Sequence, residues 1–257
     1  MCLILLAWQA HPEYPLILAA NRDEFYDRPT AAADFWEERP DILGGRDLQE
    51  GGTWLGVTRR GRWAALTNFR DPAAIRPGRP SRGWLVREYL EGSESPQAAM
   101  ERLAPRAPEY NPFNLFLGDA DSLFYLSGRG PSGPVPPGVH GLSNALLDTP
   151  WPKIRRGREA FRILLEQNPE PDPEALFRLL ADMERAPDGD LPETGIGLEW
   201  ERILSPLFIA SPTYGTRSST VLMTDRGGGI TFIERSFRGS PDSGATAKFT
   251  FSREAAP

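Results

Sequence analysis

The chain has 257 residues, of which 40% are hydrophobic and 25% charged, and its net charge is −6. This balance excludes an intrinsically disordered chain, and no apolar run approaches the ~20 residues of an integral membrane segment. Scattered arginines in an acidic chain supply no basic face, so we expect no nucleic-acid partner. We expect one cytoplasmic domain, residues 1–257, that acts on a small molecule. The sequence leaves the oligomeric state open.

Apolar runs in the first third predict β-strands at residues 3–10, 16–21, 53–58 and 63–68. The first two strands flank a turn with two prolines and are expected to pair as antiparallel neighbours. Ser81 is expected to cap a helix that runs to about Leu90, and Ser95 with Pro96 is expected to start another that runs to Leu103.

Further along the chain, residues 114–118 and 122–127 predict a hairpin. Apolar stripes at helical spacing predict helices at 151–167 and 173–185. Strands are predicted again at 206–210, 218–224, 229–235 and 246–252. Strands that open and close the chain, with helices between them, favour an α+β fold over a parallel βαβ fold.

Cys2 is the only cysteine. Removal of Met1 would give it a thiol nucleophile and a free α-amino group, whose reference pKa of about 7.7–8.0 suits a base. The alternative is a small buried residue of the first strand, because free cysteines are often buried. A lone cysteine excludes an internal disulfide and a multi-cysteine metal cluster.

Polar blocks elsewhere could complete such a site. Asp23, in the Asn21–Glu24 block, would lie near residue 2 if the first two strands pair, and would hold the ammonium; otherwise the block is a strand end that enters a solvated loop. Asn68 and Asn144 carry neutral amides suited to an oxyanion, although either could be a turn residue. Arg217 could lie beside the thiolate or form a surface ion pair.

Cofactor and metal sites have little support. With only His11 and His140, a His-rich metal site is impossible, and no phosphate-binding loop is present. We therefore predict no metal and no cofactor. A Cys2–His140 dyad is conceivable, but a structural role for His140 is preferred. The Trp54 and Trp151–Lys153 segments are interpreted as packing elements.

Seven motifs lie between residue 1 and about residue 224: Met1-Cys2, Ala20 to Phe25, Gly51 to Gly56, Thr67-Asn68, Leu142 to Asn144, Trp151 to Lys153 and Tyr214 to Ser218. Together they resemble the NRDE family, which is the family of the transport and Golgi organisation 2 proteins. The family is similar to N-terminal nucleophile hydrolases. The resemblance thus implies a four-layer αββα sandwich of two antiparallel sheets flanked by helices.

The resemblance also implies roles by position. Cys2 would be the nucleophile, Asp23 the group that orders its amine, Asn68 the oxyanion donor, Asn144 a second polar contact and Arg217 the partner of the thiolate. Asn21 and Arg22 are expected to contact the substrate. The related acylases carry an arginine slightly earlier in this block; here Ala20 precedes Asn21, and the arginine is Arg22.

The reaction expected from this set is hydrolysis of a linear amide C–N bond. The sequence leaves open whether the site is catalytic. In the rival interpretation the protein handles haem, lipid or acyl-CoA in the same pocket without catalysis, with Cys2 as a possible haem ligand. A third interpretation is a redox-sensing thiol at Cys2.

Overall fold

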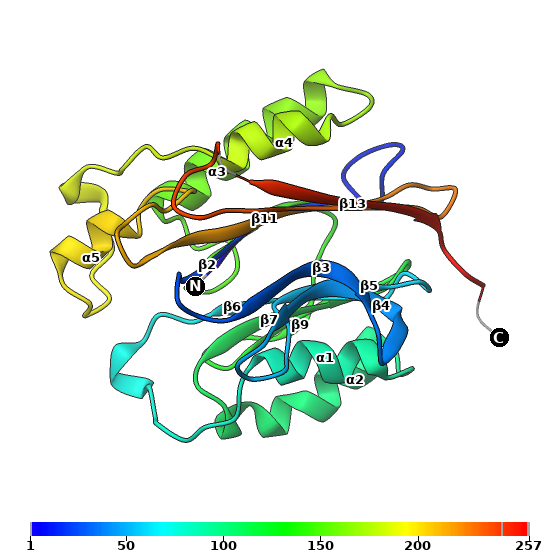
Figure 1. The fold of residues 1–257 in the computed structure, drawn as a ribbon, viewed down its shortest axis with the longest axis horizontal. Helices are drawn as coiled ribbons and strands as arrows, with labels where there is room; N and C mark the ends of the chain where they lie inside the picture. Colours follow the sequence, from blue (N-terminus) through cyan, green and yellow to red (C-terminus); the bar gives the residue numbers. More distant parts are fainter. Residues whose placement is uncertain (1, 243, 256–257) are drawn as a thin grey trace.

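Two antiparallel sheets lie face to face in the computed structural model, with helices outside each of them (Figure 1). The structure describes residues 2–242 and 244–255, and Cys2 through its backbone alone. This arrangement confirms the expected α+β class and its four αββα layers. No helix of the described residues is long and apolar enough to cross a membrane.

The first sheet has six strands in the order β10-β1-β2-β11-β12-β13. Its members are β1 (Cys2–Trp8), β2 (Leu16–Phe25), β10 (Gly138–Leu142), β11 (Tyr214–Thr224), β12 (Gly229–Ser236) and β13 (Ala245–Ser252). The expected pairing across the two-proline turn is confirmed, with Leu3 opposite Asn21 and Trp8 opposite Leu16. Of the strands that pair in this sheet, β2 and β11 are the most distant in sequence, and they lie side by side at its centre.

The second sheet has seven strands in sequence order, β3 to β9. They are β3 (Thr30–Trp36), β4 (Arg39–Asp47), β5 (Leu55–Thr58), β6 (Trp63–Asn68), β7 (Phe113–Gly118), β8 (Leu123–Ser127) and β9 (Gly133–Pro134). Each strand pairs with the next one along the chain, which gives a meander. Its connections are turns and short loops except between β6 and β7, where residues 69–112 leave the sheet and form helices.

The helices divide between the two outer faces (Figure 1). The second sheet is covered by α1 (Gly83–Glu91) and α2 (Pro96–Leu103), and the first by α3 (Pro152–Gln167) and α4 (Pro173–Leu180). A shorter helix, α5 (Leu198–Ile203), lies beside α3 and α4. Three short 3-10 turns complete the set: η1 (Pro72–Ala74), η2 (Ala104–Glu109) and η3 (Asp188–Asp190). Three apolar layers result, one between the sheets and one under each helix pair.

Strand alternation sorts the side chains of β1 and β2 between these layers. Leu16, Leu18 and Ala20 face the other sheet, whereas Ile17 and Ala19 face α3 and α4. Because both faces are covered, β1 is apolar from Leu3 to Trp8 and β2 from Leu16 to Ala20 without interruption.

Several predicted elements are wrong. Residues 206–210 form no strand; Ala210 makes only an isolated bridge to Gly215. The helix predicted to reach residue 185 ends at Leu180, and the Asp182 backbone oxygen accepts from Phe208 N instead. Ser81 is not a side-chain cap, since α1 starts without one; Ser95 does cap α2, accepting from Ala98 N.

Other strands and helices have no counterpart in the prediction, namely β3, β4, β9, β10 and α5. Charged residues interrupt β3 and β4, and β10 is only five residues long. Such strands become regular through their partners rather than through their own composition.

Candidate functional site

The Asn21–Glu24 block is not a strand end that enters a loop, as one interpretation of the sequence held. β2 continues to Phe25, because β11 pairs with it as far as Tyr214 opposite Phe25. Pairing places Cys2 opposite Arg22, Arg22 opposite Ser218, and Ser218 opposite Ser236. These four positions form one row across the first sheet, which we call the Cys2 row.

Arg22 is buried in this row although it carries a charge. Its Nη1 donates to Thr30 Oγ1 (3.1 Å), and its guanidinium lies 4.1 Å from the centroid of the Trp54 ring. The stack therefore joins the two sheets beside residue 2. A cation over an indole face is favourable, and more so where water is excluded.

Asp23 is also buried, with 1% of its surface exposed. Its Oδ1 accepts from Thr216 Oγ1 (2.7 Å). Burial raises the pKa of this carboxyl, while the Lys153 ammonium and the Thr216 hydroxyl act in the opposite direction. A carboxylate held in this way can stabilise a nearby positive charge.

Lys153 is the residue that the sequence interpretation missed. It is one of only two lysines, and it is 2% exposed in the first turn of α3. Its Nζ donates to the Leu204 backbone oxygen (3.0 Å). The signal in the sequence was the rarity of lysine together with its place directly after Trp151-Pro152. The signal in the structure is its burial, because an ammonium is seldom buried without a functional or structural partner.

Asn68 and Asn144 are brought together from opposite parts of the chain. Asn144 is fully buried, and its Nδ2 donates to the Asn68 backbone oxygen (2.8 Å). Arg70 N in turn donates to the Asn144 backbone oxygen (2.7 Å). Among the described residues the Asn68 side-chain amide has no hydrogen-bond partner. Asn144 thus holds the strand end from which the Asn68 amide projects.

A small cavity of about 110 Å³ lies at this place. Its lining includes Arg22, Asp23 and Asn68 together with Trp54. The Gly51–Trp54 loop reaches the cavity by lying directly on the start of α1: a Cβ on Gly52 would come within 2.6 Å of the Gly83 carbonyl carbon. Only glycine permits that approach, which explains this part of the motif.

Arg217 lies in a different cavity, although Trp54 lines both. It occupies the irregularity in β11 between Thr216 and Ser218. Its Nη1 donates to the backbone oxygens of Phe25 (2.8 Å) and Arg28 (3.1 Å). Burial, and then the charge of Arg22, lower the pKa of its guanidinium.

Asn21 faces the helix layer, whereas the adjacent Arg22 faces the other sheet. Its Nδ2 donates to the backbone oxygens of Leu180 and Leu207 (2.9 Å each), and its Oδ1 accepts from Ser219 Oγ (2.5 Å). The side chain is therefore occupied in fixing the end of α4 to the sheet. We do not retain it as a substrate contact.

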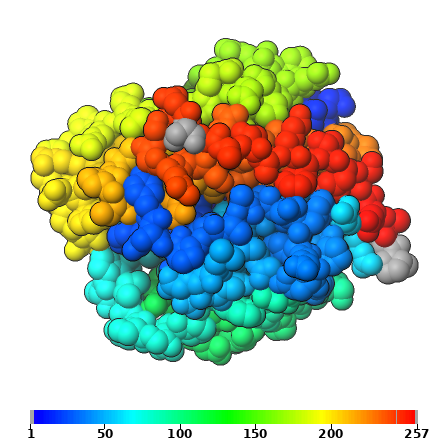
Figure 2. Space-filling view, in the orientation of Figure 1, coloured from blue at the N-terminus to red at the C-terminus, as the bar shows by residue number. Residues whose placement is uncertain are grey.

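A buried ion pair supports the same end of the molecule. Arg70 Nη1 donates to Glu201 Oε2 on α5, and the Arg70 guanidinium lies 4.7 Å from the Trp151 ring centroid. Glu201 also accepts from Thr194 N (3.1 Å). Figure 2 shows the segments that carry the two charges, yellow around α5 and cyan after β6, on the same side of the molecule.

Neither histidine is free for catalysis. His11 Nδ1 accepts from the backbone nitrogens of Glu13 and Tyr14 (3.2 Å each). His140 Nδ1 lies 2.7 Å from Asp148 Oδ2, and its Nε2 lies 2.9 Å from the Pro136 oxygen. Burial alone would lower the His140 pKa, but the bond to Asp148 raises it overall. Among the described residues no group of histidine, aspartate and glutamate could hold a metal ion.

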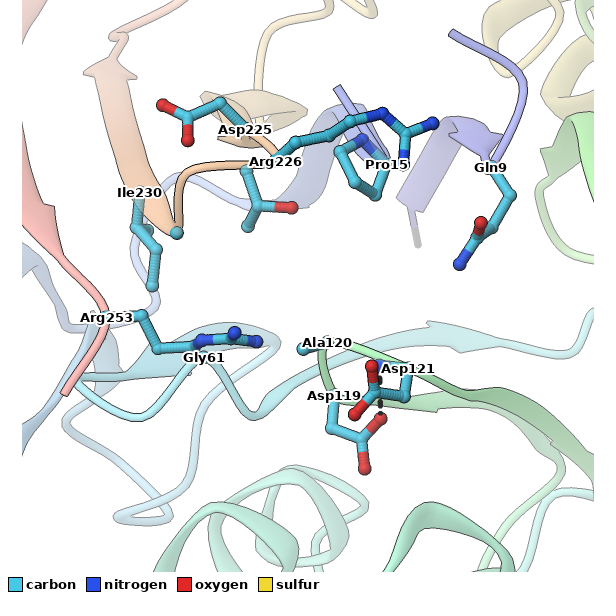
Figure 3. A pocket seen from close by; sticks show the side chains of 12 residues that line it. Gln9, Pro15, Gly61, Asp119, Ala120, Asp121, Asp225, Arg226, Ile230 and Arg253 are labelled. Atoms are coloured by element: carbon cyan, nitrogen blue, oxygen red, sulfur yellow. Dashed lines mark hydrogen bonds between the residues drawn. The ribbon is translucent and has the colours of Figure 1, made fainter. Parts of the chain in front are cut away.

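A larger cavity of about 230 Å³ lies at the opposite end of the strands, where turns meet. Figure 3 shows Asp225 and Arg226, from the turn between β11 and β12, on one side of this cavity, and Asp119 and Asp121, from the turn between β7 and β8, on the other, with Arg253 on the same side as Asp119. We call this the turn end, and the cavity of Arg22, Asp23 and Asn68 the Cys2 end. Most of the predicted site residues belong to the Cys2 end.

The family described as Transport and Golgi organisation 2 matches residues 1–239. The chain is 39% identical to the cattle Transport and Golgi organization protein 2 homolog, with 93% of this chain and 94% of that one covered. It is 37% identical to the human homolog (92% and 93% covered). A solved structure, the Caenorhabditis elegans ortholog of N-acylethanolamine-hydrolyzing acid amidase, aligns with a TM-score of 0.49 at 13% identity over 86% of this chain and 92% of that chain. The chain belongs to the Transport and Golgi organisation 2 family.

Proposed function

We propose that this protein is an N-terminal cysteine hydrolase that cleaves a linear amide C–N bond. The observation that carries the proposal is the meeting of three features at the Cys2 end. Residue 2 pairs with Arg22, the buried Asp23 follows directly, and Asn68 offers an amide with no partner among the described residues. Sites built on strands hold their groups more firmly than sites built on loops.

In the proposed reaction, removal of Met1 exposes the α-amine of Cys2. The amine accepts the thiol proton while Sγ attacks the substrate carbonyl carbon, and the Asn68 amide donates to the oxyanion. The C–N bond breaks as the proton passes to the leaving nitrogen, and an acyl thioester remains. Water then hydrolyses the thioester and restores the thiol. Asp23 would keep the amine oriented.

The test is the intact mass of the purified native protein, before and after a thiol-directed alkylating reagent. Because Cys2 is the only cysteine, every label reports on it. Loss of Met1 and fast single labelling would support the proposal, and a screen of N-acyl amides would follow. A retained Met1 with an unreactive thiol would contradict it and leave the non-catalytic ligand-binding interpretation.

A further inference from the structure

A third cavity, of about 300 Å³, extends the Cys2 row away from residue 2. Ser218 and Ser236 of that row both line it. Neighbouring strands are about 4.8 Å apart, so Ser218, two strands from Cys2, lies roughly 10 Å from residue 2 along the row. A molecule that reaches residue 2 at one end could therefore place its other end in this cavity.

Arginines without carboxylate partners surround this cavity. Arg217 and Arg238 line it, and Arg22 donates to Thr30, which also lines it. None of the three forms a salt bridge within the described part of the chain, although most arginines of this protein do. Arg217 donates only to neutral backbone oxygens. The charges of Arg22 and Arg238 lower its pKa, while Glu24 and Tyr26, which lie outside this cavity, act in the opposite direction. Clustered cations without partners favour an anion.

The one carboxyl group of the cavity does not neutralise them. Glu234, on β12, is 2% exposed, and its Oε1 accepts from Ala33 N of β3 (2.7 Å). Burial raises its pKa to about 7, although the backbone bond and the charge of Arg22 act in the opposite direction. Near neutral pH the group is therefore partly protonated. The other strands at the cavity, β3 and β13, contribute no charge, since their lining residues are Thr30, Ala32 and Ala245.

We propose that this cavity is a subsite for an oxyanion group, a carboxylate or a phosphate, on the molecule that reaches residue 2. Arg217 and Arg238 would pair with the anion, and Trp54 would pack against its apolar part. Glu234 would take up a proton as the anion binds, because two negative charges in one buried site disfavour each other. The inference rests on the proposed function only for the part of the ligand that reaches residue 2. The binding of the anion in this cavity does not depend on it.

The test measures binding to the Cys2→Ala protein by calorimetry, so that failure of catalysis cannot hide binding. The probes are benzoate and phenyl phosphate, with benzamide as the uncharged control. We expect saturable binding of the anions and none of benzamide. Tighter binding of benzoate would identify the ligand group as a carboxylate, and tighter binding of phenyl phosphate would identify it as a phosphate. Equal binding of benzamide would overturn the proposal.

Charge variants locate the binding. Arg238→Gln, an exposed position, should weaken the better anion about tenfold, the loss expected for one charge-assisted bond. Arg217→Gln should weaken it at least as much, with its thermal unfolding checked against the parent. Arg253→Gln is the matched control. Arg253 also lines a cavity, at the turn end, and forms no salt bridge with any residue that the structure describes. An Arg238 variant that binds like the parent, or an Arg253 variant that loses as much, would overturn the assignment.

The Glu234→Gln variant tests the proton uptake. In the parent, anion affinity should fall as the pH rises through 7, because ionised Glu234 repels the ligand. Glu234→Gln should remove this fall and bind at least as tightly at pH 8. An unchanged pH dependence in the variant would remove Glu234 from the subsite.

Discussion

The two ends of the sandwich are built differently. The turn end has the larger cavity of the two ends, about 230 Å³ against about 110 Å³, but two of the three carboxylates that line it are occupied in local turns. Asp119 Oδ1 accepts from Ser122 N (2.7 Å), and Asp225 Oδ1 accepts from Gly229 N (2.9 Å). At the Cys2 end the polar groups stand on strands and are buried, as Arg22 and Asp23 are.

The difference shows that the size of a cavity is a poor guide to function in this protein. Turn carboxylates satisfy nearby backbone groups and are explained by the fold itself. Buried charges cost free energy that a simple apolar core would not. Where a chain keeps several of them at one place, the fold alone does not account for them, and function is the better explanation.

The largest expected effect is on the rate of amide hydrolysis, which a variant at the Cys2 end should lower and a variant at the turn end should not. Cys2→Ala should lower amide hydrolysis by about 10⁶, the scale of loss when a nucleophile is removed. Arg253→Gln, at the turn end, should leave the rate unchanged. Release of free acid from the N-acyl amide found in the screen measures both. Residual activity in Cys2→Ala above a tenth of the parent rate would remove Cys2 from the mechanism.

The Asn68 amide should matter next. Asn68→Ala should lower kcat by about 10²–10³ with little change in KM, because an oxyanion donor acts mainly in the transition state. Asn114→Ala is a useful comparison: its Nδ2 donates to Thr67 Oγ1 (3.1 Å) and to the Ala145 backbone oxygen (2.8 Å), so it should change stability more than kcat. An unchanged kcat in Asn68→Ala would place the oxyanion elsewhere.

The buried ion pair should affect stability at the Cys2 end. Arg70→Met leaves Glu201 charged and buried, and should lower the free energy of unfolding by about 3–5 kcal/mol. Adding Glu201→Leu should recover much of that loss. Arg162→Ala, which breaks two exposed pairs, with Glu159 and Glu166, should have no measurable effect. Urea unfolding compares the three; equal losses would show that burial of the pair is unimportant.

The smallest effect concerns pH. Since the His140 pKa is raised by Asp148, the pair stabilises the fold fully below the ordinary histidine pKa of about 6.5, and this contribution is lost as the pH rises through the higher folded value. The Asp148 pKa is lowered, despite burial, by its bond to His140. The stability that the ionised Asp148 carboxylate contributes is therefore lost as the pH falls through this lowered pKa. Asp148→Asn should flatten the pH dependence of Tm between pH 6 and 8. A variant with the parent's slope would contradict this.

Composition and pattern went far towards the fold. Continuous apolar runs marked β1 and β2, because a strand covered on both faces needs them. Charged or short strands such as β3 and β10 were not predicted, because their regularity comes from pairing with neighbouring strands, which sequence periodicity does not reveal. The resemblance also grouped Cys2, Asp23, Asn68 and Asn144 as one site, and their roles stay predictions.

Only the tertiary structure separated residues that are neighbours in the chain. Asn21 and Arg22 differ by one position, yet strand alternation turns one towards the helices and the other onto Trp54. The partners Lys153, Glu201 and Glu234 come from distant segments, and their burial depends on how α3, α5 and the two sheets pack. The sequence by itself determined the apolar strands and the motifs at the Cys2 end, because periodicity and local residue chemistry are written along the chain. Packing decided which polar groups are buried together, because burial is a property of contacts between segments far apart in sequence.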